Sequence, residues 1–242
     1  MDNAHIVKSF DEELSQIESH IIEMGGIVEA QISNCVIALL ARDYELAQKV
    51  RADDKRVDLF EVEINELILK TLALRQPLAA DLRSVICALK VLANLERIGD
   101  YAKNIAKRSQ VLADVSSVGT AEKTIKRMGD MVAKMVSDVL NAYVAKDLAM
   151  AEELRLRDED VDHMHNTLFR ELLTYMMEDP RNITACMHML FIAKNLERMG
   201  DHATSIAEQI HYVVTGSLPV DSRPKGDKTS QMVIENIDKE NG

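Results

Sequence analysis

Acidic side chains recur at intervals of three or four residues in four stretches of the sequence. An α-helix turns by about 100° per residue, so side chains four positions apart return to within about 40° of one another and share a face. Carboxylate oxygens spaced in this way on two adjacent helices can bridge hard cations such as magnesium, manganese, calcium or iron, and an occasional histidine suits iron or zinc. The four stripes are Asp54, Asp58, Glu61 and Asn65; Glu96 and Asp100; Asp158, Asp162 and His165; and Glu197, Asp201, Thr204 and Glu208.

Spacing alone leaves two interpretations of these stripes open. Like charges four residues apart destabilise an isolated helix by about a few tenths of a kcal/mol, and a bound cation would compensate for that cost. The alternative is a solvated acidic face on which Arg97 and Arg198 pair with the neighbouring acids. In both cases we expect the acids on an outer face, because an apolar stripe that contains Leu196 and Met199 lies roughly opposite them.

A glycine lies inside two of the stripes, at Gly99 and at Gly200. Glycine in the middle of a helix costs about 1 kcal/mol relative to alanine. Close approach of a neighbouring helix, or room for ligands beside the acids, would explain these glycines. Plain tolerance of a glycine is equally compatible with the sequence.

The segments that carry the acids occur in two copies. Residues 24–58 match residues 128–162 at a shift of 104, with 12 of 35 positions identical. The segment NLERIGDYAKNIA, residues 94–106, matches NLERMGDHATSIA, residues 195–207, with nine of thirteen residues identical. We therefore interpret the chain as a tandem duplication.

The first copy is expected to form three helices. Apolar residues from Leu14 to Ala38 recur at spacings of three and four, which predicts a helix that faces a bundle core. Asp43 marks the start of a second helix that runs to about residue 74. Pro77 is expected to open the third, since its missing amide costs nothing at the first position of a helix.

The second copy repeats this plan over residues 120–145, 147–177 and 180–214, with Asp179 as an N-cap and Gly216 as the final stop. The sequence thus predicts an all-α protein made of two tandem three-helix bundles. The expected domains are residues 1–116 and 117–216, followed by a mobile tail over residues 217–242 that contains two prolines, two glycines and many charges.

Composition supports long helices and excludes several classes of protein. Nine glycines, four prolines and no tryptophan in 242 residues disfavour an all-β fold. With 29 Lys and Arg against 40 Asp and Glu, the net charge is −11, which argues against a nucleic-acid partner because that affinity depends on basic side chains.

The N-terminus does not resemble a secretory signal, and we find no apolar run near the roughly 18 residues of a spanning helix, so we expect a cytoplasmic protein. Three widely spaced cysteines, Cys35, Cys87 and Cys186, are expected to be buried.

Familiar catalytic motifs are absent from the sequence: there is no Gly-rich phosphate loop, no Gly-x-Ser-x-Gly elbow and no dinucleotide fingerprint. The alternative to a binding protein is a metal-dependent phosphatase or hydrolase that uses the carboxylates to activate water. No histidine or lysine in the pattern is placed as a general acid or base, which weighs against that alternative.

Two copies of Asn-Leu-Glu-Arg-x-Gly-Asp, each with an upstream Asp-x-x-x-Asp, resemble the PhoU family of accessory regulators of phosphate uptake. The resemblance covers roughly residues 5–216 and implies two three-helix bundles related by a pseudo-twofold axis. It also implies multinuclear metal sites, with iron or zinc as the metal. The ligands implied by the resemblance are Asp54, Asp58, Glu96 and Asp100 in the first copy, and Asp158, Asp162, Glu197 and Asp201 in the second.

The same resemblance implies a regulator without enzymatic activity. Such a protein binds the ATPase subunit of the phosphate ABC transporter and the sensor histidine kinase of the phosphate two-component system, forms a homodimer, and reaches the inner face of the membrane only through these partners. The sequence departs from the family pattern once in each copy. The histidine that follows the motif is present as His202 but is replaced by Tyr101 in the first copy, and the asparagine present as Asn104 is replaced by Ser205 in the second.

Overall fold

The computed structural model describes residues 3–113 and 119–220, with side chains from residue 9 onward. Within these ranges the chain forms six long α-helices and one short 3₁₀ helix, and no strand. The prediction of an all-α fold is therefore confirmed. The helices are α1 (Asn3–Ala41), α2 (Tyr44–Arg75), α3 (Ala80–Leu112), α4 (Ala121–Ala145), α5 (Leu148–Glu178) and α6 (Ile183–Thr215), and the 3₁₀ helix η1 is Pro180–Asn182.

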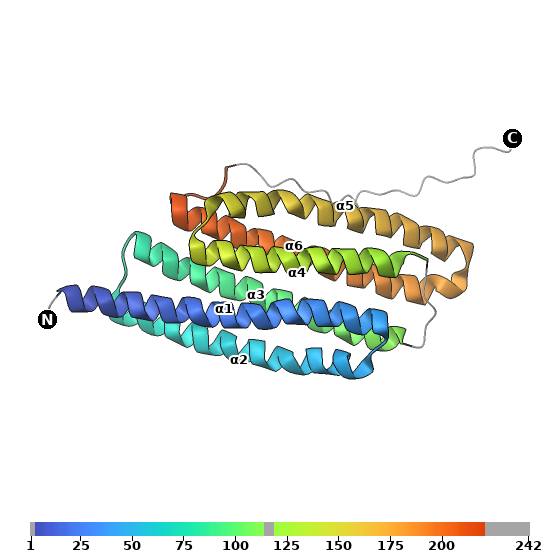
Figure 1. Ribbon diagram of the computed structural model, residues 1–242, viewed down its shortest axis with the longest axis horizontal. Coiled ribbons are helices and arrows are strands. Elements are labelled where there is room, and N and C mark those ends of the chain that lie inside the picture. The colour runs from blue at the N-terminus through green and yellow to red at the C-terminus, as the bar shows by residue number, and fades with distance from the viewer. Residues whose placement is uncertain (1–2, 114–118, 221–242) are drawn as a thin grey trace.

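The six helices form two three-helix bundles that lie side by side (Figure 1). Helices α1, α2 and α3 pack on one another in the first bundle, and α4, α5 and α6 do so in the second. The bundles meet where α1 packs against α4 and α3 packs against α6, so that α2 and α5 lie on the outside (Figure 1). The long α3/α6 and α1/α4 contacts join both copies in one elongated body.

The two copies repeat each other at the level of the backbone. Asp43 and Asp147 are the N-caps of α2 and α5, both with φ −84° and ψ 100°. The Asp43 carboxylate accepts a hydrogen bond from the Leu46 amide at 2.9 Å, and Asp147 accepts one from the Met150 amide at 3.0 Å. These bonds satisfy amides that have no partner within the first turn of the helix, which explains why a helix begins after each aspartate.

Two helix starts differ from the sequence-based prediction. The third helix begins at Ala80 and not at Pro77, because Ala79 adopts a positive φ of 49° that interrupts a helix. Asp179 accepts a hydrogen bond from the Arg181 amide at 2.9 Å, as a cap does, but it caps η1 and α6 follows at Ile183. At the other end of α6, Gly216 stops the helix as expected, with φ 83°. Most of the predicted tail, residues 221–242, lies outside the described residues.

Apolar side chains from both bundles form one continuous core. Cys35, Cys87 and Cys186 are buried in it as thiols, as predicted. The segment Ser9–Ala41 in α1 is long and apolar enough to cross a membrane by length and composition, which the sequence analysis did not anticipate. Half of its most apolar window is buried inside the protein, because α1 contacts α2, α3 and α4.

Candidate metal centres

The first acidic cluster lies between α2 and α3. Asp54 on α2 is 3% exposed, and its carboxylate forms an ion pair with the ammonium of Lys103 on α3. The same ammonium lies 3.4 Å from Asp100 Oδ1, so one lysine joins carboxylates from both helices. Arg97 contacts Glu96 at 3.6 Å and Asp100 at 3.7 Å from the solvent side.

Electrostatic coupling shows that the predicted ligands of this cluster are close to one another. Burial raises the pKa of Asp54, Lys103 opposes that shift, and the charges of Asp58 and Asp100 add to it. Burial and then the charge of Asp100 raise the pKa of Glu96 to about 7. The structure therefore brings Asp54, Asp58, Glu96 and Asp100 together, although Asp58 is exposed to solvent.

The second acidic cluster lies between α5 and α6. Asp158 and Asp162 on α5 are 1% and 4% exposed, and Glu197 on α6 is 4% exposed, whereas Asp201 is partly exposed. Glu197 Oε1 is paired with the Lys194 ammonium at 2.8 Å.

Gly200 makes room for this second cluster. A Cβ atom at Gly200 would lie 2.7 Å from Asp158 Oδ1, so only glycine at this position lets the carboxylate approach the helix so closely. At Gly99 the equivalent Cβ would lie 3.3 Å from Gln31 Oε1 and 3.4 Å from Val57, a tight fit against side chains of α1 and α2. The sequence left several explanations of these glycines open. At Gly99 the reason is the close approach of the neighbouring helices, and at Gly200 it is the space that the Asp158 carboxylate needs.

The expectation that the acids line an outer face is wrong for half of the eight predicted ligands. Asp54, Asp158, Asp162 and Glu197 are buried. The spacing of residues along a helix identifies which of them share a face, but it does not show which helix packs against that face. In the structure, α2 lies against the acidic side of α3, and α5 lies against the acidic side of α6. Burial of several carboxylates in one place is costly unless cations accompany them.

The donor set of each cluster fits a hard or borderline cation, since it consists of carboxylate oxygens from two facing helices. Among the described residues, however, no three Asp, Glu, His or Cys side chains are arranged as ligands of one metal ion. Lysines approach the carboxylates instead: Lys103 in the first cluster and Lys194 in the second. The metal ligands thus remain a prediction.

The two lysines are the main feature of the clusters that the sequence analysis missed. Lys103 follows Asp100 by three residues and Lys194 precedes Glu197 by three, which are the spacings of side-chain neighbours on a helix. The signal was therefore present, but the pairing of Lys103 with Asp54 on another helix depends on the packing of α2 against α3.

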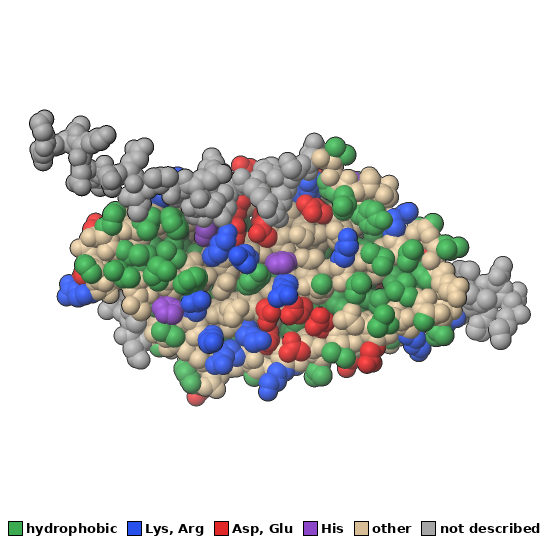
Figure 2. Space-filling model, turned by 180° about the vertical axis from the view of Figure 1, so that it is seen from behind, with side chains coloured by type: hydrophobic (Ala, Val, Ile, Leu, Met, Phe, Trp, Pro, Cys, Tyr) green, Lys and Arg blue, Asp and Glu red, His purple; other side chains and the backbone are tan. Residues whose placement is uncertain are grey.

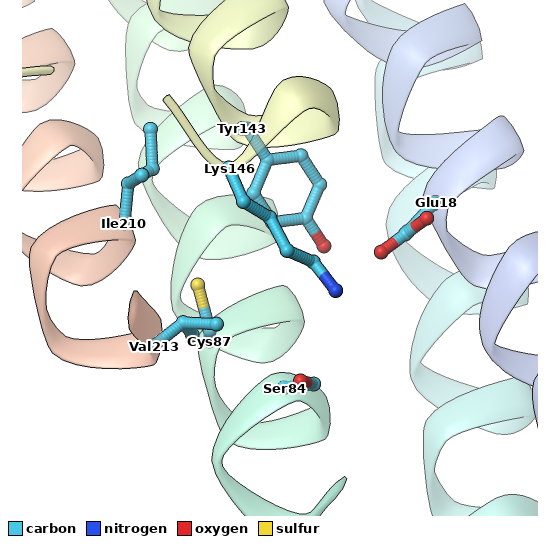
Figure 3. Close-up of a pocket in the computed structure, with 7 residues that line it drawn as sticks. All are labelled: Glu18, Ser84, Cys87, Tyr143, Lys146, Ile210 and Val213. Carbon is cyan, nitrogen blue, oxygen red and sulfur yellow. The ribbon is translucent and has the colours of Figure 1, made fainter. Parts of the chain in front are cut away.

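A second feature missed by the sequence analysis is a small cavity of about 10 Å³ where the two bundles meet (Figure 3). The Glu18 carboxylate, the Tyr143 hydroxyl and the Lys146 ammonium point toward one another at its edge (Figure 3). Burial raises the pKa of the Cys87 thiol, which also lines the cavity, to about 12, so this thiol is not a nucleophile at neutral pH. The cavity has room for about one water molecule.

The fold and the sites define a class of protein: a duplicated six-helix bundle in which each copy holds a carboxylate cluster between two facing helices. A family model described as the PhoU domain matches the chain twice, over residues 21–109 and 125–210. The chain belongs to the PhoU family.

Curated relatives and solved structures match over almost the whole chain. A protein of Caulobacter vibrioides (strain NA1000 / CB15N) named phosphate-specific transport system accessory protein PhoU homolog is 49% identical over 94% of this chain and 99% of its own length. A protein of Rhizobium meliloti (strain 1021) with the same name is 45% identical over 96% of this chain and 98% of its own length.

The crystal structure of PhoU from Pseudomonas aeruginosa is similar with a TM-score of 0.84 and 40% identity, over 86% of this chain and 100% of that chain. The phosphate transport system regulatory protein PhoU from Streptococcus pneumoniae gives a TM-score of 0.81 and 29% identity, over 88% of this chain and 100% of that chain. These likenesses confirm the resemblance expected from the duplicated motifs.

Proposed function

We propose that this protein regulates phosphate homeostasis, as a negative regulator of phosphate uptake and of the phosphate-starvation response. The observation that carries the proposal is its similarity, over nearly its full length, to relatives named as accessory proteins of phosphate-specific transport. It acts in the cytoplasm by binding the ATPase subunit of the phosphate ABC transporter and a sensor histidine kinase, and it reaches the membrane through them.

The protein acts by binding and not by catalysis in this proposal. The names of its relatives describe accessory and regulatory proteins. In the first cluster, the carboxylates that would activate water in a hydrolase are paired with Lys103. We expect no turnover of generic phosphate esters in the presence of manganese or iron, and turnover that is lost in Asp100→Ala would contradict this part of the proposal.

Deletion of the gene tests the regulatory role. With abundant phosphate, a strain without the protein should express phosphate-starvation genes and take up labelled phosphate faster than the parent strain, and the intact gene should restore both. Unchanged gene expression together with unchanged uptake would overturn the proposal.

We further propose that the two carboxylate clusters bind metal ions, with iron or zinc as the first candidates and magnesium, manganese or calcium as alternatives. The first site would use Asp54, Asp58, Glu96 and Asp100, and the second Asp158, Asp162, Glu197 and Asp201. Buried carboxylates from facing helices support this assignment, because bound cations would neutralise them.

Elemental analysis of the purified protein tests the metal assignment. We expect bound transition metal that decreases in Asp100→Ala and in Asp201→Ala, and disappears when both are combined. Glu63→Ala, a change at an exposed glutamate of α2, is the matched control and should retain the metal. A wild-type protein that takes up no metal under any loading condition would remove the assignment.

A further inference from the structure

Helices α3 and α6 run antiparallel along one face of the protein, so that equivalent residues of the two copies meet at its centre. Tyr101 and His202 occupy equivalent positions, 101 residues apart, and their ring centroids are 5.7 Å apart. The His202 ring nitrogen Nδ1 also lies 2.8 Å from Asn94 Oδ1, across the two helices. The pseudo-twofold axis that relates the copies therefore passes through this point of the face.

Each end of this face carries exposed apolar side chains, seen on either side of a charged centre in Figure 2. At one end, Leu82 near the start of α3 is 39% exposed and lies near the end of α6, where Val214 is 45% exposed. At the other end, Ile183 and Met187 near the start of α6 are 45% and 39% exposed. Leu82 and Ile183 are equivalent residues of the two copies, so the duplication presents an apolar patch twice, once on each side of the axis.

Two exposed arginines lie near the axis, beside the acidic side chains at the centre of this face (Figure 2). Arg97 and Arg198 are equivalent residues, both exposed, one from each copy. Burial and then both arginines lower the pKa of His202, so both guanidinium groups lie close to it. Arg97 already contacts Glu96 and Asp100 at 3.6 and 3.7 Å, and Arg198 donates to the Tyr101 hydroxyl at 3.4 Å, but both guanidinium groups remain exposed and can accept a further anionic partner.

We propose that the α3/α6 face is the docking surface for a homodimeric protein, whose own twofold axis coincides with the pseudo-twofold axis of this chain. Acidic side chains near the axis of that partner contact Arg97 and Arg198, and apolar side chains of its two subunits contact the patches around Leu82 and Met187. One chain then binds one partner dimer. This inference rests on the proposed function only in that the protein acts by binding another protein.

The symmetry of the surface is the argument for a dimeric partner. A twofold dimer presents every surface patch twice, related by a 180° rotation, and the duplicated chain does the same. Once one partner subunit has bound the patch at one end, the second subunit is held close to the patch at the other end. The second contact therefore forms at a high effective concentration. A monomeric partner without internal symmetry would have to meet the two apolar ends with two different surfaces.

Photo-crosslinking in living cells tests this surface. We would place benzoylphenylalanine at Leu82, at Met187 or at both in the full chain, and at Ile37 on α1 as the control, which is 51% exposed and belongs to the opposite α1/α4 face. Cells are grown with abundant phosphate, and products are identified by mass spectrometry. Leu82 and Met187 should each capture the same protein, and the double variant should capture two subunits of it per chain.

Arg97→Glu combined with Arg198→Glu should lower the yield of these crosslinked products about tenfold.

Several outcomes would overturn the inference. Crosslinks could form through Ile37 alone, at only one of the two ends, or not at all at Leu82 and Met187. The captured molecule could also be a single partner subunit per chain, another copy of this chain, or lipid. If a homodimer other than the transporter ATPase or the sensor kinase is captured at both ends, the docking surface is supported and the proposed partners are wrong. If the ATPase is captured only through Ile37, the proposed function is supported and the docking surface is wrong.

Discussion

At the scale of single residues, Lys103 holds the first carboxylate cluster together. Its ammonium pairs with buried Asp54 and with Asp100, and no other described cation is paired with the Asp54 carboxylate. Lys103→Met leaves that carboxylate buried without its counter-charge, so we expect a loss of about 1–3 kcal/mol in the free energy of unfolding of the metal-free protein.

Urea unfolding of four proteins measures this effect: wild type, Lys103→Met, Asp54→Asn and the double variant. The double variant should lose less than the sum of the single losses, because Asp54→Asn removes the charge that Lys103 compensates. Added divalent metal should restore part of the stability of Lys103→Met, since a ligand that binds the native state stabilises it. Strictly additive losses would show that the ion pair does not stabilise the protein.

The raised pKa of Glu96 predicts that the free energy of unfolding depends on pH. Its pKa is raised to about 7 from a usual value of 4.5, chiefly by burial, so between these two values the folded protein binds more protons than the unfolded chain. Stability is therefore lost as the pH rises from about 5 to 7. In chelator-treated protein, Glu96→Gln should flatten this decline, measured as the free energy of unfolding at each pH. Glu63→Gln, at an exposed position, should leave the decline unchanged, and parallel profiles for wild type and Glu96→Gln would contradict the prediction.

At the scale of helices, Gly200 shows how one element positions a side chain of another. In Gly200→Ala, the added Cβ would lie 2.7 Å from Asp158 Oδ1, so the carboxylate must move within a packed environment. We expect a loss of about 1–2 kcal/mol and a lower metal content of the second cluster. Gly26→Ala is the matched control, since nothing lies within 4 Å of its Cβ, and the higher helix propensity of alanine should stabilise the protein by about 0.5–1 kcal/mol. Equal effects in both variants would show that the space at Gly200 is not needed.

The capping aspartates give a second prediction at this scale. Asp43→Ala and Asp147→Ala each remove an N-cap hydrogen bond and should each cost about 1 kcal/mol, read from the urea midpoint. Because the two caps lie in different bundles, the losses should add in the double variant. Asparagine at either position should recover most of the stability, and a midpoint unchanged by alanine would contradict the role of the caps.

The helices and the duplication could be predicted from the sequence because they depend on local signals. Periodic apolar residues identify α1, Asp43 and Asp147 mark the starts of α2 and α5, and the repeated motif identifies the equivalent residues. The burial of Asp54 and Asp158 could not be predicted in this way, since it depends on which side of a neighbouring helix packs against each stripe. The positive φ of Ala79 that delays α3 is also set by the connection between two long helices and not by a local pattern.

At the scale of the whole molecule, the duplication gives each carboxylate cluster and each long helix of the α3/α6 face an equivalent in the other copy. Each bundle holds one carboxylate cluster, and both bundles contribute a long helix to the α3/α6 face. A protein built in this way offers two carboxylate clusters, for which metal binding is proposed, and a surface of twofold character from a single chain. This arrangement suits a protein that acts by holding partners together, which is the role proposed for it in phosphate regulation.

Affinity capture of the tagged chain from cells grown with abundant phosphate tests the central claim most directly. The tagged gene must first restore normal regulation in the deletion strain, so that the captured protein is functional. Mass spectrometry should then show the transporter ATPase subunit or the sensor histidine kinase enriched over a capture with the tag alone. A functional tagged protein that enriches neither of them would contradict the account.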